Sequence, residues 1–452
     1  MNRKIFFVGL LICFLIVAVP ASIQGLTLAA ATNNEGPVFG PQSASDPTDQ
    51  IMIKFKDAAS EAVLLANKSS GPLPELSKAA GQEVTYVRPM FDEVHVVKLA
   101  ERMSPKDVAQ AAADMTAVPG VAYAEPDLIK GIDGRPQTNP FAPDLSPNDP
   151  QFANQWHYKY VAGSSEGLNL IPAWDIYTGS ASTVVAVIDT GILPHSDLAG
   201  KTVPGYDFIA DVATANDGNG RDADPSDPGD WIAASECFPG NQASNSSWHG
   251  THVAGTIGAA TNNGAGVAGV NWNAKILPIR VLGKCGGYTS DIIDGMRWAA
   301  GLTVTGVTNN PNPAKVLNLS LGGSGPCSST EQTAINAIVA AGSTVVIAAG
   351  NNNDDASGYS PGNCNNIITV AANDRSGDRA YYSNYGSIVE VTGPGGAQSF
   401  ANDSNGVLST LDGGATTPLN DNAYKYYQGT SMATPHVAGV ASLLLSVEPS
   451  LT

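Results

Sequence analysis

The sequence predicts a mixed α/β protein with a mainly parallel central sheet, preceded by a small α+β domain. From about residue 150 onward, short runs rich in Val and Ile alternate with helical stretches. Strands of this kind need burial on both faces, and their alternation with helices is the βαβ order of a parallel sheet. Residues 50–128 instead follow the order β-α-β-β-α-β, which is typical of a ferredoxin-like unit. The chain is therefore expected to contain at least two folded parts.

The elements of the small unit can be placed from turn and capping residues. Ser104 can cap the second helix, because Pro105 then takes the first helical position and Asp107 lies near the helix amino terminus. The full expected order is a strand at 51–56, a helix near 58–68, strands between 83 and 98, the capped helix, and a strand at 121–124. Residues 131–148 are rich in Gly and Pro and are expected to form neither helix nor sheet, so 129–148 is predicted to be a processing linker.

The parallel sheet is expected from five strands and two helices. The predicted strands cover residues 183–188, 274–282, 315–319, 344–348 and 367–371, and the predicted helices cover 289–300 and 330–341. These elements assign residues 149–452 to one large domain.

The composition is that of a compact protein with a sizeable core. The 452 residues are 43% hydrophobic and only 14% charged, well below the roughly 25% of average soluble chains. The formal net charge is −18, and no cluster of Lys and Arg follows residue 4. Phosphate binding requires a basic surface, so a nucleic-acid partner is not expected. An acidic surface favours solubility and cation binding.

The amino terminus has the order of a secretory signal. Arg3 and Lys4 precede the apolar run 5–19, and small residues follow. This pattern predicts a signal peptide over residues 1–31, cleaved after Ala21 or Ala31, and hence a secreted protein. A membrane anchor is the weaker alternative, because about 20 apolar residues are needed to span a bilayer. No membrane association is expected after signal removal.

Four cysteines remain once the predicted signal, which contains Cys13, is removed. They are Cys237, Cys285, Cys327 and Cys364. An even number in an oxidising compartment predicts two disulfides. A zinc site is the alternative, but the spacings contain no C-x2-C pair.

Three segments carry residues with catalytic potential. Asp189 in VIDTG lies just beyond the carboxyl end of a predicted buried strand, where α/β sheets place their sites. His249 opens a helix in HGTHVAGT, and Ser431 in GTSMATPHVAG precedes the apolar helix 437–445. Taken singly, such residues are usually caps, turns or packing residues. Together they supply a hydroxyl, a base for it and an anion that orients the base.

These three blocks, in the order Asp, His, Ser, resemble the signatures of the subtilisin-like serine proteases. The resemblance covers about residues 150–452, and residues 50–128 resemble the inhibitory propeptide of that family. It implies the three-layer subtilisin-like fold, with Ser431 as nucleophile, His249 as general base and then acid, and Asp189 as the group that holds the imidazole. It also makes His252 a packing residue. Asn351 in IAAGNN resembles the side-chain donor of the oxyanion hole, beside the backbone N–H of Ser431.

The same resemblance places the substrate cleft. An extended peptide would be held as an added β-strand between two edges and beside a pocket, which implies broad sequence tolerance. The implied substrate-binding residues are Lys284, Cys285, Gly286, Gly287, Ser320, Leu321, Gly322, Ala348, Ala349 and Gly350, together with the loop 358–361. With both walls so placed, the disulfides Cys237–Cys285 and Cys327–Cys364 are favoured among the three connectivities that four cysteines allow.

An acidic insertion at residues 217–230 predicts calcium binding. It packs five carboxylates into fourteen residues, and a hard divalent cation would relieve their repulsion; a solvated acidic loop is the alternative. The five residues are Asp217, Asp222, Asp224, Asp227 and Asp230. By the resemblance, Asp197 in HSDL is a ligand of the family's main calcium site, with a companion loop near Asn262 and Asn263.

We therefore expect a monomeric, calcium-stabilised, secreted serine endopeptidase that cleaves peptide bonds through an acyl-enzyme on Ser431. Its propeptide would inhibit it and be removed by self-cleavage in or near residues 126–148. A non-catalytic binding protein that kept the fold is the alternative, although it would normally have lost one of the four catalytic residues. A processing enzyme that acts on few substrates is a third hypothesis. Because Thr452 closely follows the nucleophile's helix, the catalytic domain is expected to be truncated at its carboxyl end.

Overall fold

The structure is a computed structural model that describes residues 48–451, except residues 70, 72, 133–145 and 160–166. The predicted signal peptide and most of the predicted linker lie outside the described residues. All described residues belong to one unit, Gly36–Thr452.

Residues 48–126 form an amino-terminal domain with a four-stranded antiparallel sheet in the order β2-β3-β1-β4. This is the ferredoxin-like arrangement predicted from the sequence. The Ser104 side chain accepts a hydrogen bond from the Asp107 backbone N–H and caps α3. The elements are β1 (Thr48–Phe55), α1 (Ala58–Leu64), α2 (Pro74–Ala80), β2 (Val84–Pro89), β3 (Val94–Met103), α3 (Pro105–Thr116) and β4 (Val121–Pro126). Helix α2 was not predicted.

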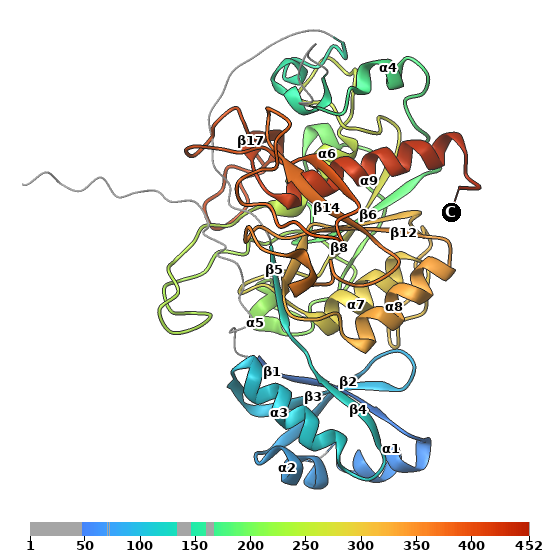
Figure 1. Ribbon diagram of the computed structural model, residues 1–452, viewed down its shortest axis with the longest axis vertical. Helices are drawn as coiled ribbons and strands as arrows, with labels where there is room; N and C mark the ends of the chain where they lie inside the picture. Colours follow the sequence, from blue (N-terminus) through green and yellow to red (C-terminus); the bar gives the residue numbers. More distant parts are fainter. Residues whose placement is uncertain (1–47, 70, 72, 133–145, 160–166, 452) are drawn as a thin grey trace, which may run out of the picture. The chain divides into compact units, whose positions relative to one another are not determined.

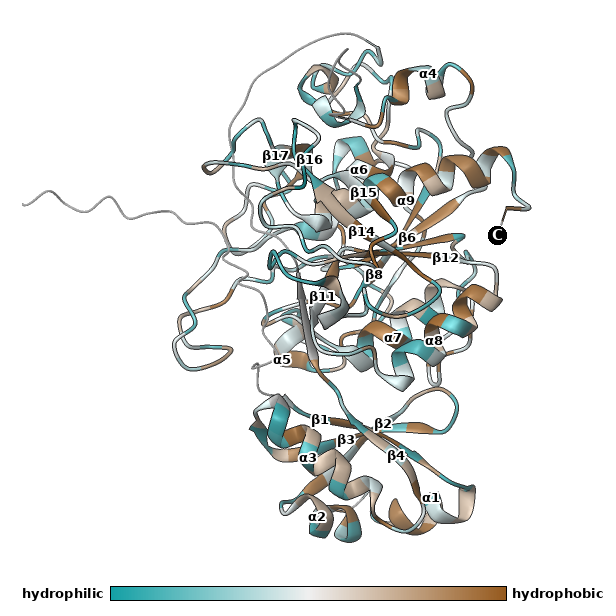
Figure 2. Cartoon of the chain, in the orientation of Figure 1, coloured by the Kyte–Doolittle hydropathy of each residue, from teal (hydrophilic) through white to brown (hydrophobic). Residues whose placement is uncertain are grey.

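The large domain is built on a seven-stranded parallel sheet in the order β15-β14-β12-β10-β6-β8-β7. Five of these strands match the predicted ones, and the two edge strands β7 and β15 were missed. The strands are β6 (Val184–Asp189), β7 (Tyr206–Asp207), β8 (Lys275–Arg280), β10 (Val316–Leu319), β12 (Thr344–Ala348), β14 (Ile368–Asn373) and β15 (Val391–Pro394). Figure 2 shows that the central strands are strongly hydrophobic, as strands covered on both faces must be.

Helices cover both faces of this sheet and give three layers (Figure 1). Helices α6 (His249–Gly258) and α9 (Thr430–Val447) pack on one face, and α7 (Thr289–Ala299) and α8 (Ser329–Ala340) pack on the other. Helix α9 is apolar enough in composition to cross a membrane, but most of it is buried inside the domain, so it is a core helix. Shorter helices are α4 (Leu170–Trp174) and α5 (Val212–Ala215), with 3₁₀ turns η1 (Phe152–Asn154), η2 (Trp156–Tyr158), η3 (Ser196–Leu198) and η4 (Ala356–Gly358).

A second four-stranded sheet joins the two domains. Its order is β13-β11-β5-β9, and all its pairs are antiparallel. The strands are β5 (Ile129–Ile132), β9 (Gly287–Tyr288), β11 (Leu321–Ser324) and β13 (Tyr359–Ser360); a separate hairpin contains β16 (Val407–Leu411) and β17 (Ala423–Tyr427). The prediction that residues 131–148 contain no sheet is wrong for the first two residues of this segment. Residues 131 and 132 end β5, because strands of the large domain on both sides supply hydrogen-bonding partners.

Candidate active site

Asp189 and His249 form a hydrogen-bonded pair at the carboxyl edge of the parallel sheet. Asp189 ends the central strand β6, and His249 is the first residue of α6. His249 Nδ1 lies 2.8 Å from Asp189 Oδ1 and 2.9 Å from Oδ2. The two residues are 0% and 3% exposed, so the interaction is shielded from water. An Nδ1–H donated to the carboxylate leaves Nε2 as the basic nitrogen, and His249 Nε2 makes no hydrogen bond to any described residue.

Ser431 lies in the first turn of α9, which also meets the carboxyl edge of the sheet. Gly429 precedes the helix at φ 147°, a conformation that favours glycine. The Ser431 hydroxyl donates to the Ser320 carbonyl at 3.1 Å, and the Ser320 hydroxyl donates to the Ser431 carbonyl at 2.8 Å. These reciprocal bonds fix the start of α9 against the residue that precedes β11. First-turn N–H groups have no partner within their own helix, so this end favours negative charge.

Asn351 follows β12 and has its amide orientation fixed by Thr430. Asn351 Oδ1 accepts hydrogen bonds from the Thr430 N–H at 2.8 Å and from the Thr430 hydroxyl at 3.1 Å. With the oxygen so engaged, Nδ2 is enclosed and donates to no described residue. A buried donor without an acceptor is costly, so this geometry indicates a place for an acceptor supplied by a substrate. Sequence reasoning found Asn351 but missed Thr430.

The chain itself occupies the predicted substrate cleft. Strand β5 pairs with Gly287 and Tyr288 on one side and with Leu321 and Gly322 on the other. Both sides are segments that the resemblance placed at the cleft edges. The β5 backbone therefore takes the position of an added β-strand, next to the segment that contacts Ser431.

The walls of the cleft are braced by polar contacts and by one disulfide. Lys284 Nζ lies 2.5 Å from Glu236 Oε1 and 3.7 Å from the centre of the Trp231 ring. Cys285 adopts φ 65° and is bonded to Cys237. In the predicted side-chain pocket, Ala348 and Ala349 are buried, and the Gly350 N–H donates to the Thr430 hydroxyl at 3.2 Å.

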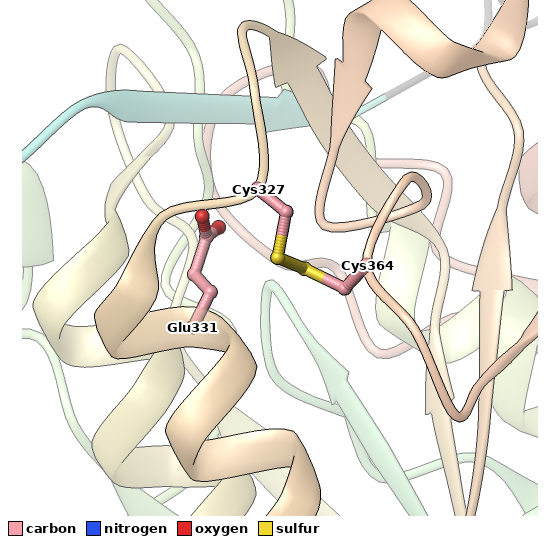
Figure 3. Close-up of side chains that lie close together, drawn as sticks. All are labelled: Cys327, Glu331 and Cys364. Carbon is pink, nitrogen blue, oxygen red and sulfur yellow. A yellow bond between two sulfur atoms is a disulfide. The ribbon is translucent and has the colours of Figure 1, made fainter.

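A second disulfide joins Cys327 to Cys364, so the structure has the connectivity that was favoured (Figure 3). Glu331 lies beside it, so that one possible metal-ligand atom from each of these three residues lies within 4.8 Å of the others. Both sulfurs are consumed by the disulfide, and Glu331 instead forms a capping box with Ser328 at the start of α8. This group therefore does not have the chemistry of a metal site.

The carboxylates of the acidic insertion do not converge on one point. No three of them bring ligand atoms together within the described residues. Asp217 contacts Arg280, while Asp222 and Asp224 accept backbone hydrogen bonds from Asp224 and Ser226. Asp227 and Asp230 are instead buried: burial raises the pKa of Asp227 to about 8, with repulsion from Asp230 adding to it, and burial raises that of Asp230 to about 6.

Asp197 lies apart from the insertion and has the features of a cation ligand. Its Oδ2 accepts from the Val267 N–H at 2.7 Å and from the Tyr424 hydroxyl at 3.0 Å. Its Oδ1 is buried and accepts no hydrogen bond from a described residue. Asp149 accepts from the Asn262 N–H at 2.7 Å, and its pKa is raised by burial and by the charge of Asp197.

His252 lies one turn after His249 but is a packing residue in its contacts. Its Nε2 lies near the carbonyls of Val407 and Lys425, at 3.1 and 3.0 Å, and its ring stacks on Tyr427. Burial lowers the pKa of His252 to about 3. The imidazole is therefore neutral at working pH.

The sequence profile of the subtilase family, a peptidase family, matches residues 180–452. The chain belongs to the subtilase family. Members of this family commonly bind calcium. With the subtilase family identified, the three-layer domain described above is its fold.

Similar proteins are proteases by name. The chain is 54% identical to an extracellular protease of Xanthomonas campestris pv. campestris over 68% of this chain and 50% of the relative. It is 39% identical to an extracellular basic protease of Dichelobacter nodosus over 97% of this chain and 69% of the relative. A solved protease structure from Pseudoalteromonas arctica is 61% identical, with a TM-score of 0.66, over 68% of this chain and 89% of that one. The chain thus spans half to about two thirds of these curated relatives. Their names agree with the predicted export signal, and this subtilase is extracellular.

Proposed function

We propose that this subtilase is a secreted serine endopeptidase that cleaves peptide bonds through an acyl-enzyme on Ser431. One observation carries the proposal. The buried Asp189–His249 pair lies at the same edge of the sheet as Ser431, and Thr430 turns the Asn351 amide so that its Nδ2 donates to none of the residues that the structure describes.

Each residue then has a role that follows from its contacts. Asp189 fixes the tautomer that carries the proton on Nδ1, so His249 Nε2 can take the proton of the Ser431 hydroxyl as it attacks the scissile carbonyl. For this step the hydroxyl must turn from the Ser320 carbonyl towards Nε2, as catalytic hydrogen bonds often tighten only with substrate bound. The tetrahedral oxyanion receives hydrogen bonds from Asn351 Nδ2 and from the Ser431 backbone N–H. His249 then donates its proton to the leaving amine.

Substrates bind in the place that β5 occupies. Gly287 and Gly322 pair through their backbones, so they recognise the peptide main chain and tolerate many side chains. This supports broad cleavage of unfolded proteins over cleavage of a few specific partners.

We assign residues 48–132 to an inhibitory propeptide, cleaved within 133–148. Besides inserting β5, it docks on the amino termini of two helices. Glu125 accepts from the Ser329 N–H at 3.1 Å at the start of α8. Asp127 accepts from the Ser290 N–H at 2.9 Å and from the Ser290 hydroxyl at the start of α7. Carboxylates at these positions complement the helix dipoles.

Apolar contacts complete the docking. Phe91 and other buried side chains of the amino-terminal domain pack against Ile293 of α7 and Ala334 of α8. This shared cluster would be exposed when the propeptide leaves, so the inhibitory domain and the protease stabilise each other.

We further propose that Asp197 holds a structural calcium ion together with Asp149 and the 262–263 loop. Asp197 Oδ1, which accepts no hydrogen bond within the described part of the chain, and the neighbouring carboxylate of Asp149 fit an ion that prefers oxygen ligands. When bound, the ion would neutralise these charges and fasten the start of the protease domain to the loop after α6.

The test compares the wild-type chain with Ser431→Ala and, as a matched control, with Ser376→Ala at an exposed serine. We expect wild type and Ser376→Ala to mature and to cut casein at many sites, and Ser431→Ala to remain an uncut, inactive precursor. A Ser431→Ala chain that matured and digested casein would refute both the nucleophile and self-processing.

A further inference from the structure

Asp230, the last carboxylate of the acidic insertion, is buried against Ser247. It is 1% exposed, and an aspartate is rarely buried to this extent unless its carboxylate has partners. Its Oδ1 accepts from the Ser247 N–H at 2.6 Å, and its Oδ2 accepts from the Ser247 hydroxyl at 2.7 Å. Both oxygens thus hold one residue, which lies two positions before His249.

Ser247 fixes a strained turn at the start of α6. The next residue, Trp248, is the N-cap and adopts φ 51° and ψ 33°, which is unfavourable for a bulky side chain. Such a conformation is strained and persists only where the surroundings enforce it. Here the Trp248 indole donates to the Gly414 carbonyl at 2.7 Å, and the Tyr427 hydroxyl donates to the Ser247 carbonyl at 2.8 Å.

The same turn fixes the position of the His249 backbone. The His249 N–H lies 3.3 Å from the Ser247 hydroxyl oxygen, whose own proton is directed to Asp230. A chain of contacts therefore runs from Asp230 through Ser247 to His249. Loss of Asp230 would release the N–H and the hydroxyl of Ser247 and leave only its carbonyl held, by Tyr427.

Asp230 also contributes charge to this region. His249 lies close enough for a positive charge on it to favour ionised Asp230. The other titratable groups that face this pair are Asp189 from β6, Asp227 from the insertion, Tyr427 from β17 and His252 from α6. An anion near an imidazole stabilises its protonated form, which is the form that His249 takes after accepting the serine proton.

We propose that Asp230 is a positioning residue for His249: it holds the strained Ser247–Trp248 turn and supplies, beside Asp189, a second negative charge near His249. This rests on the proposed role of His249 as general base. It also gives the acidic insertion a function that needs no metal, because its last carboxylate serves the active site directly.

The test is Asp230→Asn in the full chain, which keeps the side-chain shape and removes the charge. Mature enzyme is titrated with a serine-directed inhibitor, and kcat and KM for a peptide anilide are measured from pH 5 to pH 10. We expect kcat to fall about 10- to 100-fold, because the imidazole of His249 is misplaced. KM should stay within about twofold, because the substrate-binding segments are unchanged. We also expect the acid half-maximum of kcat/KM to move down by about 0.5 to 1 pH unit. Asp378→Asn, at an exposed carboxylate, should change neither quantity.

Two further variants separate geometry from charge. Ser247→Ala removes the hydroxyl link but leaves Asp230 bonded to the Ser247 N–H, so kcat should fall while the half-maximum stays in place. Asp227→Asn combined with Asp230→Asn should shift the half-maximum more than Asp230→Asn alone, because Asp227 can then no longer ionise in place of Asp230.

An unchanged pH profile and kcat in Asp230→Asn would overturn the proposal. If Asp230→Asn failed to mature, the kcat of Ser247→Ala would test the proposal instead. A wild-type kcat in that variant would refute the chain of contacts from Asp230 through Ser247 to His249. Failure of the underlying function is distinguishable, since it would show as activity in Ser431→Ala, whatever Asp230 does.

Discussion

Replacing Arg88 by alanine is expected to weaken docking of the amino-terminal domain by about 1–2 kcal/mol. Arg88 lies 2.6 Å from Asp294 and 3.1 Å from Asp291, two buried carboxylates of α7. Breaking a buried ion pair usually costs about 3–5 kcal/mol, because it leaves an unpaired charge. Here Arg221 of the acidic insertion contacts the same two carboxylates, at 2.8 Å from Asp294 and 2.5 Å from Asp291. Both acids therefore keep a partner, and the loss is limited to the bonds of Arg88 itself.

The assay measures how fast the cleaved propeptide is released and how fast protease activity appears after the proposed self-cleavage. A loss of 1–2 kcal/mol corresponds to release about 5- to 30-fold faster. Lys106→Ala, at an exposed cation of the same domain, should leave the rate unchanged. An unchanged rate in Arg88→Ala would refute the docking role. An increase of more than about 100-fold would show that Arg221 does not compensate.

Three other outcomes follow from the site and its supports. Asn351→Ala should lower kcat about 100- to 1000-fold with little change in KM, a range adopted from the corresponding donor of subtilisin; a change mainly in KM would contradict the oxyanion role. Burial raises the pKa of Asp127 to about 7, so the docked state holds its proton more tightly than the free carboxyl does. In urea unfolding of the Ser431→Ala chain, ionisation of Asp127 should therefore lower the stability by about 1–3 kcal/mol as pH rises from about 4 to 7, and Asp127→Asn should reduce the pH dependence by about that amount; equal slopes in the two chains would contradict it. Removing calcium with a chelator should lower Tm by about 5–10 °C, and Asp197→Asn should lower it without further response to chelator; a chelator effect of equal size in Asp197→Asn would place the ion elsewhere.

The sheet could be predicted where the strands are buried on both faces. Central strands such as β6 and β12 are runs of Val, Ile and Ala, which only a covered parallel sheet accommodates. The edge strands could not be found in this way. β7 has only two residues, and β15 contains Gly and Pro with two exposed positions, so neither leaves a hydrophobic run in the sequence.

β5 was missed for a different physical reason. Its segment contains Gly131 and leads into a Pro-rich stretch, which by local propensity is a linker. It forms a strand because β9 and β11 lie on both sides of it and supply hydrogen-bonding partners. Such pairing is a tertiary contact, and local sequence does not record it.

The chemical groups of the site were predictable, while the residues that orient them were not. Asp189, His249 and Ser431 stand in long motifs whose residue types are constrained together. Thr430 contacts Asn351, and Asp230 contacts Ser247, only because the fold brings together residues that are far apart in the sequence. The sequence shows Asp230 only as one acid among five, because the density of charge in a loop does not reveal which carboxylate is buried.

The most direct test of the catalytic assignment is the intact mass of the secreted product with and without a serine-directed inhibitor. For the wild-type chain, we expect a product that begins after residue 132, carries two disulfides and gains one inhibitor adduct. That adduct should map to Ser431 and be absent from an uncut Ser431→Ala chain. An adduct on another residue, or a Ser431→Ala chain cleaved like wild type, would contradict the account.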